Sequence, residues 1–109
     1  MKIAAIQMVS GTRVDGNLAA AERLLGEAAA QGCELAVLPE HFCLLGRADT
    51  DKLALREPLG EGPIQAFLAD RARALGLWIA GGTLPLVASD AGHVRNASLV
   101  FSPRGERVA

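Results

Sequence analysis

The sequence predicts an α/β fold, because short apolar segments alternate along the chain with amphipathic helices. The segments Lys2–Met8, Glu34–Leu38 and Leu77–Gly82 have the length and apolar character of buried strands. Between them, Asn17–Gln31 and Pro63–Leu75 repeat apolar side chains at the spacing of a helix that buries one face. This order favours parallel strands that are joined by crossover helices.

The first helix is expected to begin near Asp15 or Asn17, since either side chain can accept hydrogen bonds from the free N–H groups of a first turn. Gly32 is well placed to follow the helix as its C′ residue. The apolar stripe of this helix consists of Leu18, Ala21, Leu24, Leu25 and Ala28.

The chain between the second strand and the second helix is ambiguous. Asp49–Arg56 has room for a helical turn or two, after which a proline and two glycines interrupt the chain. The second helix is expected to begin at Pro63, because proline is favoured at the first helical position, and to end at Gly76. The third strand then leads to the pair Gly81–Gly82.

The last part of the chain predicts a hairpin. His93–Phe101 is expected as a fourth strand of the same sheet, followed by a turn over Ser102–Gly105 and by a strand that begins at Glu106. Because this last strand has barely begun where the sequence stops, we expect the chain to be a fragment. Successive right-handed crossovers would place both helices on one face of the sheet.

Composition excludes several classes of function. The chain has 109 residues, of which 50% are hydrophobic, and its net charge is −1, as in a globular domain rather than a disordered segment. The 11 basic and 12 acidic residues are interspersed, so no basic stripe for nucleic acid is expected. Apolar runs are too short for a membrane span or a signal peptide, which predicts a cytoplasmic protein.

The two cysteines and two histidines give weak signals. Cys33 and Cys43 match no metal spacing and no disulfide framework, so both are expected to be reduced and to pack as small apolar side chains. Cys43 lies three residues after Glu40, which leaves a Cys/Glu pairing open, but no histidine is placed convincingly as its base. His41 and His93 are expected at the surface.

Two further features, one rich in glycine and one polar, are weak candidates for a site. Gly81–Gly82 lacks the three-glycine spacing of a dinucleotide loop, and the sequence contains no phosphate-binding GK[ST] loop. Asn96, a polar residue within the fourth strand, is expected to be a buried hydrogen-bonding residue with a structural role.

Glu40 is the strongest candidate for chemistry, because it follows a buried strand that is stopped by Pro39. Sites of α/β folds are usually built at the carboxyl ends of the strands. The segment Phe42–Gly46 is too apolar for an ordinary surface loop and is expected to fold over a pocket with the Glu40 carboxylate beneath it. The alternative is that Glu40 faces solvent in a loop without any function.

Several motifs together resemble the N-terminal half of the nitrilase, or carbon–nitrogen hydrolase, superfamily. The most specific element is the strand followed by Pro39, Glu40 and Phe42. The other matching elements, which cover essentially the whole chain, are Ala4–Met8, Asn17, Gly62–Pro63, Gly81–Thr83 and Asn96–Phe101. The likeness is greatest to the amidase branch that hydrolyses deaminated glutathione and related ω-amides.

The resemblance implies an α-β-β-α sandwich, of which residues 1–109 would form the N-terminal part of one domain. It also implies a Glu–Lys–Cys triad in which Glu40 is the general base. The lysine would follow shortly after the strand at Glu106–Ala109 and the cysteine farther on, so this chain would lack both and be inactive alone. Neither Cys33 nor Cys43 occupies the nucleophile motif.

Two functions are therefore expected, in order. The first is a fragment of a cofactor-independent amidase that acts on a small carboxylate-bearing amide and forms a homodimer or higher homo-oligomer at full length. The second is a non-catalytic α/β module that binds a ligand or partner through Phe42–Gly46. The residues that select a substrate would lie mostly beyond Ala109.

Overall fold

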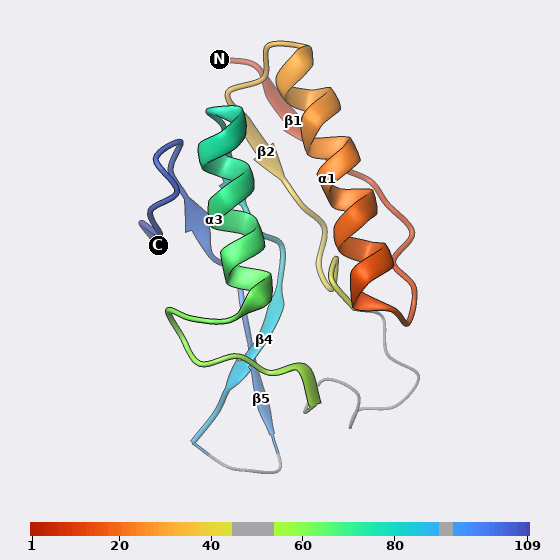
Figure 1. The fold of residues 1–109 in the computed structure, drawn as a ribbon, viewed down its shortest axis with the longest axis vertical. Coiled ribbons are helices and arrows are strands. Elements are labelled where there is room, and N and C mark those ends of the chain that lie inside the picture. The colour runs from red at the N-terminus through yellow and green to blue at the C-terminus, as the bar shows by residue number, and fades with distance from the viewer. Residues whose placement is uncertain (45–53, 90–92) are drawn as a thin grey trace.

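The structure is a computed structural model that describes residues 1–44, 54–89 and 93–109. The elements whose bounds lie within the described residues are two helices and six short strands, which form two layers (Figure 1). The main sheet has the strand order β1-β2-β3-β6, and a separate two-stranded sheet pairs β4 with β5. The α/β class and the predicted helices are thus confirmed, while the second half of the sheet is organised differently from the prediction.

The main sheet begins with the predicted parallel strands. β1 (Ile3–Ala5), β2 (Leu35–Val37) and β3 (Trp78–Ala80) lie in register and in sequence order, although each is shorter than its apolar segment. The short β6 (Val100–Phe101) pairs antiparallel with β3. A turn follows in which the Gly105 N–H donates to the Ser102 carbonyl oxygen at 2.8 Å, as the hairpin prediction requires.

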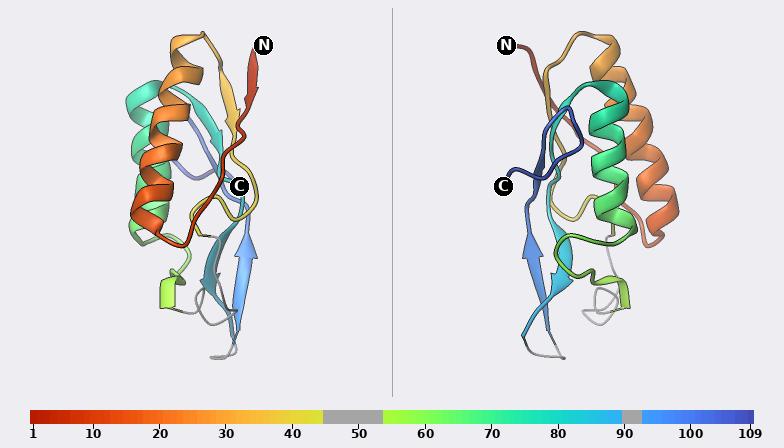
Figure 2. Two further views of the ribbon diagram at one scale, coloured as in Figure 1. Left: turned by 90° about the vertical axis from the view of Figure 1, so that its right-hand side faces the viewer. Right: turned by 60° about the vertical axis from the view of Figure 1, so that its left-hand side comes forward.

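Both crossover helices cover the same face of this sheet, which confirms the prediction (Figure 2). They are α1 (Val14–Ala30) and α3 (Pro63–Leu75). In each strand every second side chain points toward the helices and packs against their inner side chains. The core therefore lies between the helices and this face of the sheet. Its fully covered members include Ala21, Leu25, Ala36, Leu38, Ile64, Leu68, Ala72, Ile79 and Phe101.

The helix ends agree with the glycine signals but not with the predicted N-cap. Gly32 and Gly76 both adopt a positive φ directly after a helix, at 82° and 62°. The first helix instead begins at Val14, and its N-cap residue Arg13 caps through no side-chain hydrogen bond. Asp15 lies in the first turn, where the hydrogen bond from the Arg13 side chain lowers the pKa of the carboxyl group.

The predicted fourth strand was wrong as a single element. β5 (Val94–Ala97) leaves the main sheet and pairs antiparallel with β4 (Leu84–Val87), a strand that the sequence analysis did not predict. The chain returns to the main sheet only at β6. Proline is tolerated in β4 because Pro85 needs no N–H donor on the side away from β5, where its carbonyl oxygen accepts the Glu57 N–H at 3.0 Å.

Glu57 is a buried carboxylate that connects three segments of the chain. Its backbone bridges to β4 beside Leu86, while its two carboxylate oxygens accept the N–H groups of Ile64 at 2.7 Å and Gln65 at 3.1 Å. These are free donors of the first turn of α3, so Glu57 caps this helix from five residues before its N-cap, Gly62. A methyl group at Gly62 would overlap the carboxylate.

The face of the main sheet opposite the helices is apolar and is covered by no segment that the structure describes. Ile3 is 56% exposed, Val37 38% and Trp78 40%, and these side chains alternate with the covered residues of their strands. Large exposed apolar patches on a domain usually mark a surface that another segment or partner covers. Among the described residues, neither helix is both long and apolar enough to cross a membrane.

The first prediction concerns this open face. The isolated 109-residue chain should self-associate in sedimentation velocity, because its apolar sheet face would otherwise remain in water. Replacing Ile3 and Trp78 together by lysine should reduce the association, whereas Val9→Lys, at a side chain that is 98% exposed outside the sheet, should not. A wild-type chain that sediments as a stable monomer would contradict this account.

A second prediction tests the Glu57 cap. Glu57→Gln replaces one accepting oxygen by an NH₂ group that faces a backbone N–H donor, so folding stability should fall by about 1–3 kcal/mol. Protection of the Ile64 and Gln65 amides from hydrogen exchange should fall with it. Glu61→Gln, at an exposed residue of the same loop, is the matched control. Equal protection in Glu57→Gln and the control would refute the capping role.

Candidate functional site

The candidate site lies at the carboxyl edge of the three parallel strands. β1, β2 and β3 run in the same direction, so the segments that follow them meet at one edge. The ladder continues briefly past β2, where the Leu38 N–H donates to the Ala80 carbonyl oxygen at 2.9 Å. Pro39 and Glu40 come next, and the chain then turns sharply through residues 40–43.

The turn after Glu40 has an unusual backbone. His41 has a φ of 53° and is the one non-glycine residue with a positive φ in the described part of the chain. Its N–H donates to the Thr83 hydroxyl at 2.8 Å. Positive φ costs a residue with a Cβ free energy, so it persists only where the surroundings fix it. The turn is therefore held in place by its contacts and not by the preference of its own sequence.

The pair Gly81–Gly82 supports the turn from β3. Gly82 has a φ of 62°, and a methyl group there would overlap the carbonyl oxygen of Pro39. The Gly81 N–H donates to the Leu99 carbonyl oxygen at 2.7 Å. The two glycines thus allow close approach between neighbouring segments.

Asn17 binds the turn from the start of α1. Its Nδ2 donates to the carbonyl oxygens of Cys43 at 2.8 Å and Gly11 at 3.0 Å, and its Oδ1 accepts the Gly11 N–H at 2.8 Å. The prediction that Asn17 caps the helix was wrong, because the helix begins three residues earlier and these backbone groups take up the amide. Ser10 contributes similarly, with its hydroxyl donating to the Phe42 carbonyl oxygen at 2.8 Å.

The expectation that Phe42–Gly46 fold over a pocket was wrong for Phe42, Cys43 and Leu44, the residues of this segment that the structure describes. Phe42, Cys43 and Leu44 are at most 5% exposed and lie in the core, and Leu45–Gly46 fall outside the described residues. Because these apolar side chains turn inward, no described residue covers Glu40, whose side chain is exposed rather than partly buried. The burial of Cys43 supports its predicted packing role, and Cys33 packs against the same core.

The remaining predicted positions lie away from this edge. His93 is exposed beside β5, and Asn96 within β5 is also exposed, so the prediction of a buried asparagine was wrong. The physical reason is that β5 forms the outer strand of a two-stranded sheet instead of a central strand. Most of the helical turn proposed for Asp49–Arg56 falls outside the described residues. Within the described residues, no group of acidic, histidine and cysteine side chains has the arrangement of a metal site.

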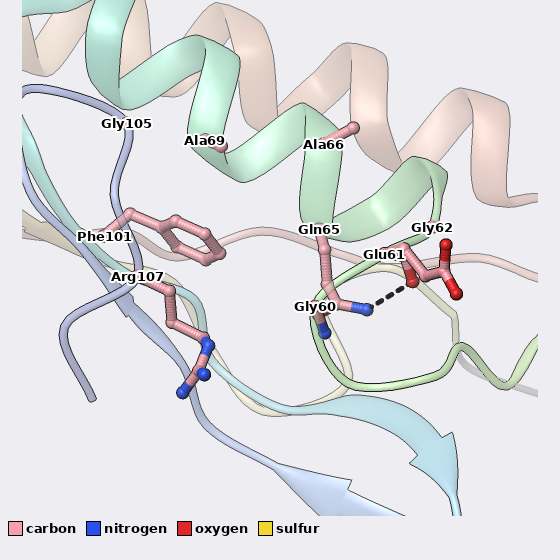
Figure 3. A pocket seen from close by; sticks show the side chains of 9 residues that line it. All are labelled: Gly60, Glu61, Gly62, Gln65, Ala66, Ala69, Phe101, Gly105 and Arg107. Carbon is pink, nitrogen blue, oxygen red and sulfur yellow. Dashed lines mark hydrogen bonds between the residues drawn. The ribbon is translucent and has the colours of Figure 1, made fainter.

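A separate pocket of about 390 Å³ lies between the first half of α3 and the final hairpin (Figure 3). Gln65 forms one wall and donates through Nε2 to the Glu61 carbonyl oxygen at 2.8 Å. The Phe101 ring forms another wall, and Arg107 extends from the hairpin beside it. No lining residue belongs to the turn after Glu40, so the pocket is not part of the candidate site.

Sequence reasoning missed Ser10, Thr83 and Glu57. Thr83 could have been found by the argument that selected Glu40, since it is a polar residue directly after Gly81–Gly82 at the carboxyl end of a neighbouring strand. Ser10 follows β1 in the same way. Glu57 gave no comparable signal, because it lies too far before the helix to be recognised as its cap.

Known proteins are similar to this chain over nearly its whole length. The family model for carbon-nitrogen hydrolase matches residues 2–109. A deaminated glutathione amidase of Synechocystis is 36% identical over 107 residues, which are 97% of this chain and 39% of the relative. The omega-amidase NIT2 of Danio rerio is 34% identical over 106 residues, covering 95% of this chain and 36% of the relative. The chain thus spans about two fifths of the length of these relatives.

Solved structures show the same fold. Nit3 of Saccharomyces cerevisiae, a member of branch 10 of the nitrilase superfamily, matches all of this chain and 42% of its own with a TM-score of 0.85 at 22% identity. The NitFhit protein of C. elegans matches 98% of this chain and 26% of its own with a TM-score of 0.81 at 27% identity. Because the family model covers nearly every residue and the fold agrees, this chain belongs to the carbon–nitrogen hydrolase family.

Proposed function

We propose that this chain is the N-terminal part of an amidase domain and supplies its general base, Glu40. The observation that carries the proposal is the position of Glu40 at the carboxyl edge of three parallel strands, on a turn with a strained backbone that three neighbouring segments hold. Strain that is maintained at a sheet edge is typical of functional sites. Family membership supports hydrolysis of a C–N bond as the reaction.

In the proposed reaction, Glu40 accepts the thiol proton of a cysteine while the sulfur attacks the amide carbonyl carbon. A lysine stabilises the oxyanion of the tetrahedral intermediate. As the C–N bond breaks, the protonated carboxyl returns a proton to the leaving nitrogen, and ammonia and a thioester result. Glu40 then accepts a proton from the water that attacks the thioester carbon. As the C–S bond breaks, the protonated carboxyl returns this proton to the leaving sulfur, which releases the acid and restores the thiol and the Glu40 carboxylate. The cysteine and the lysine are expected beyond Ala109.

The proposed substrate is a small amide that also carries a carboxylate. Support comes from the relatives, among which are a deaminated glutathione amidase and an omega-amidase. The proposed reaction is an acid–base and acyl-transfer sequence in which water is the only co-substrate of the amide. A cytoplasmic location and a homodimeric or higher assembly of the full-length protein stay predictions.

The alternative of a non-catalytic binding module has less support. It relied on Phe42–Gly46 as a ligand-binding loop, yet Phe42, Cys43 and Leu44 are buried in the core. Buried side chains offer no surface to a ligand. We therefore retain the amidase proposal.

The third prediction tests the role of Glu40 in the full-length protein. Glu40→Gln keeps the shape of the side chain but removes the proton acceptor, so kcat for ammonia release should fall by about 10²–10⁴-fold while KM changes little. Release of ammonia from deaminated glutathione and from a panel of ω-amides gives the measurement.

Glu34→Gln is the matched control, since Glu34 is an exposed glutamate just before β2, at the opposite end of the same strand. The control should retain wild-type kcat. Near-normal amide hydrolysis by Glu40→Gln would remove Glu40 from the catalytic machinery.

A further inference from the structure

The three residues that follow Glu40 are each held by a different part of the chain. Thr83 accepts the His41 N–H, Ser10 donates to the Phe42 carbonyl oxygen, and Asn17 donates to the Cys43 carbonyl oxygen. Each of the three contacts measures 2.8 Å. The three holding side chains lie after β3, after β1 and at the start of α1, respectively. We call Ser10, Asn17 and Thr83 the turn clamp.

The turn clamp acts on the backbone and not on the Glu40 carboxylate. Among the residues that the structure describes, no side chain forms a hydrogen bond or an ion pair with Glu40, and the glutamate is exposed. The backbone of the turn therefore sets the direction of the Glu40 Cα–Cβ bond, from which the side chain extends. The first peptide N–H after Glu40 belongs to His41, which is the group that Thr83 binds.

The backbone conformation shows why such a clamp is needed. The φ of 53° at His41 is unfavourable for a residue with a Cβ, so without its contacts the turn would relax toward a negative φ. Relaxation would rotate the peptide between Glu40 and His41 and redirect the glutamate. Gly82 lies against the Pro39 carbonyl oxygen and limits movement on the other side of Glu40.

We propose that the turn clamp positions Glu40 for proton transfer, with Thr83 as its most direct positioning residue. This inference rests on the proposed role of Glu40 as general base. A displacement of a reacting group by about 1 Å can cost about 100-fold in rate. Loss of the clamp should therefore lower kcat without removing substrate-binding groups, because none of its three members is expected to contact the substrate.

The test uses the full-length protein and ammonia release from deaminated glutathione and a panel of ω-amides. Thr83→Val removes the accepting hydroxyl at nearly constant volume and should lower kcat by about 10- to 100-fold, with KM unchanged within about threefold. Thr83→Ser restores the hydroxyl and should recover kcat to within about threefold of wild type. Thr12→Val, at an exposed threonine of the loop before α1, is the matched control and should be silent.

A purely structural role is separated by measuring kcat per folded molecule well below the midpoint of thermal unfolding. If Thr83 had a purely structural role, Thr83→Val would lower the midpoint of thermal unfolding and leave kcat unchanged. Wild-type kcat in folded Thr83→Val would therefore overturn the positioning role. If Thr83→Val fails to fold, Ser10→Ala is the second test. It removes the partly buried hydroxyl of another member of the turn clamp and should also lower kcat with KM unchanged. Full kcat in folded Ser10→Ala would then overturn the proposal.

The same assay separates this inference from the proposed function. Loss of activity in Glu40→Gln together with full kcat in folded Thr83→Val would refute the clamp and leave the general base in place. Full activity in Glu40→Gln, or no ammonia release by the wild-type protein from any amide of the panel, would refute both.

Discussion

The parallel register of β1, β2 and β3 is the constraint on which the candidate site depends. Ala4, Ala36 and Ile79 lie side by side across the three strands, so the segments that leave these strands emerge at the same edge. Contacts between residues that are 26 to 42 positions apart in the sequence become possible only through this alignment. A shift of one strand by one residue would also turn its covered side chains to the open face.

Two sets of polar contacts then hold the segments whose conformation the sheet does not determine. The turn after Glu40 is tied to its neighbours by hydroxyl and amide side chains, and the second crossover is tied down by the buried Glu57 carboxylate. Both sets of contacts satisfy backbone groups that would otherwise be left without partners. No described buried side-chain nitrogen or oxygen lacks a hydrogen-bond partner, so hydrogen bonds offset the cost of burying these polar groups.

Local signals predicted the part of the fold that depends on them. Helix spacing and helix-end residues act through the backbone of their own segment. The structure confirms Pro63 as the first residue of its helix and positive φ values at Gly32 and Gly76 after the two helices. The separation of β5 from β6 could not be read locally, because residues 93–101 have uniform strand character and the exchange of partner depends on β4. The same holds for Asn17, whose partners at Gly11 and Cys43 are brought to it by the fold and not by sequence spacing.

The sequence predicted where the candidate site lies but not how the residues around Glu40 pack. Glu40 after Pro39 and a buried strand indicated the carboxyl edge, and the fold puts it there. The sequence left open whether the Glu40 side chain is covered or faces solvent, because the burial of Phe42 to Leu44 follows from core packing around the whole domain. The most direct test is a crystal structure of the full-length protein with an amide bound. We expect a Glu40 carboxylate oxygen within hydrogen-bond reach of the reacting cysteine sulfur and His41 at a positive φ. A Glu40 that points away from that sulfur into solvent would contradict the account.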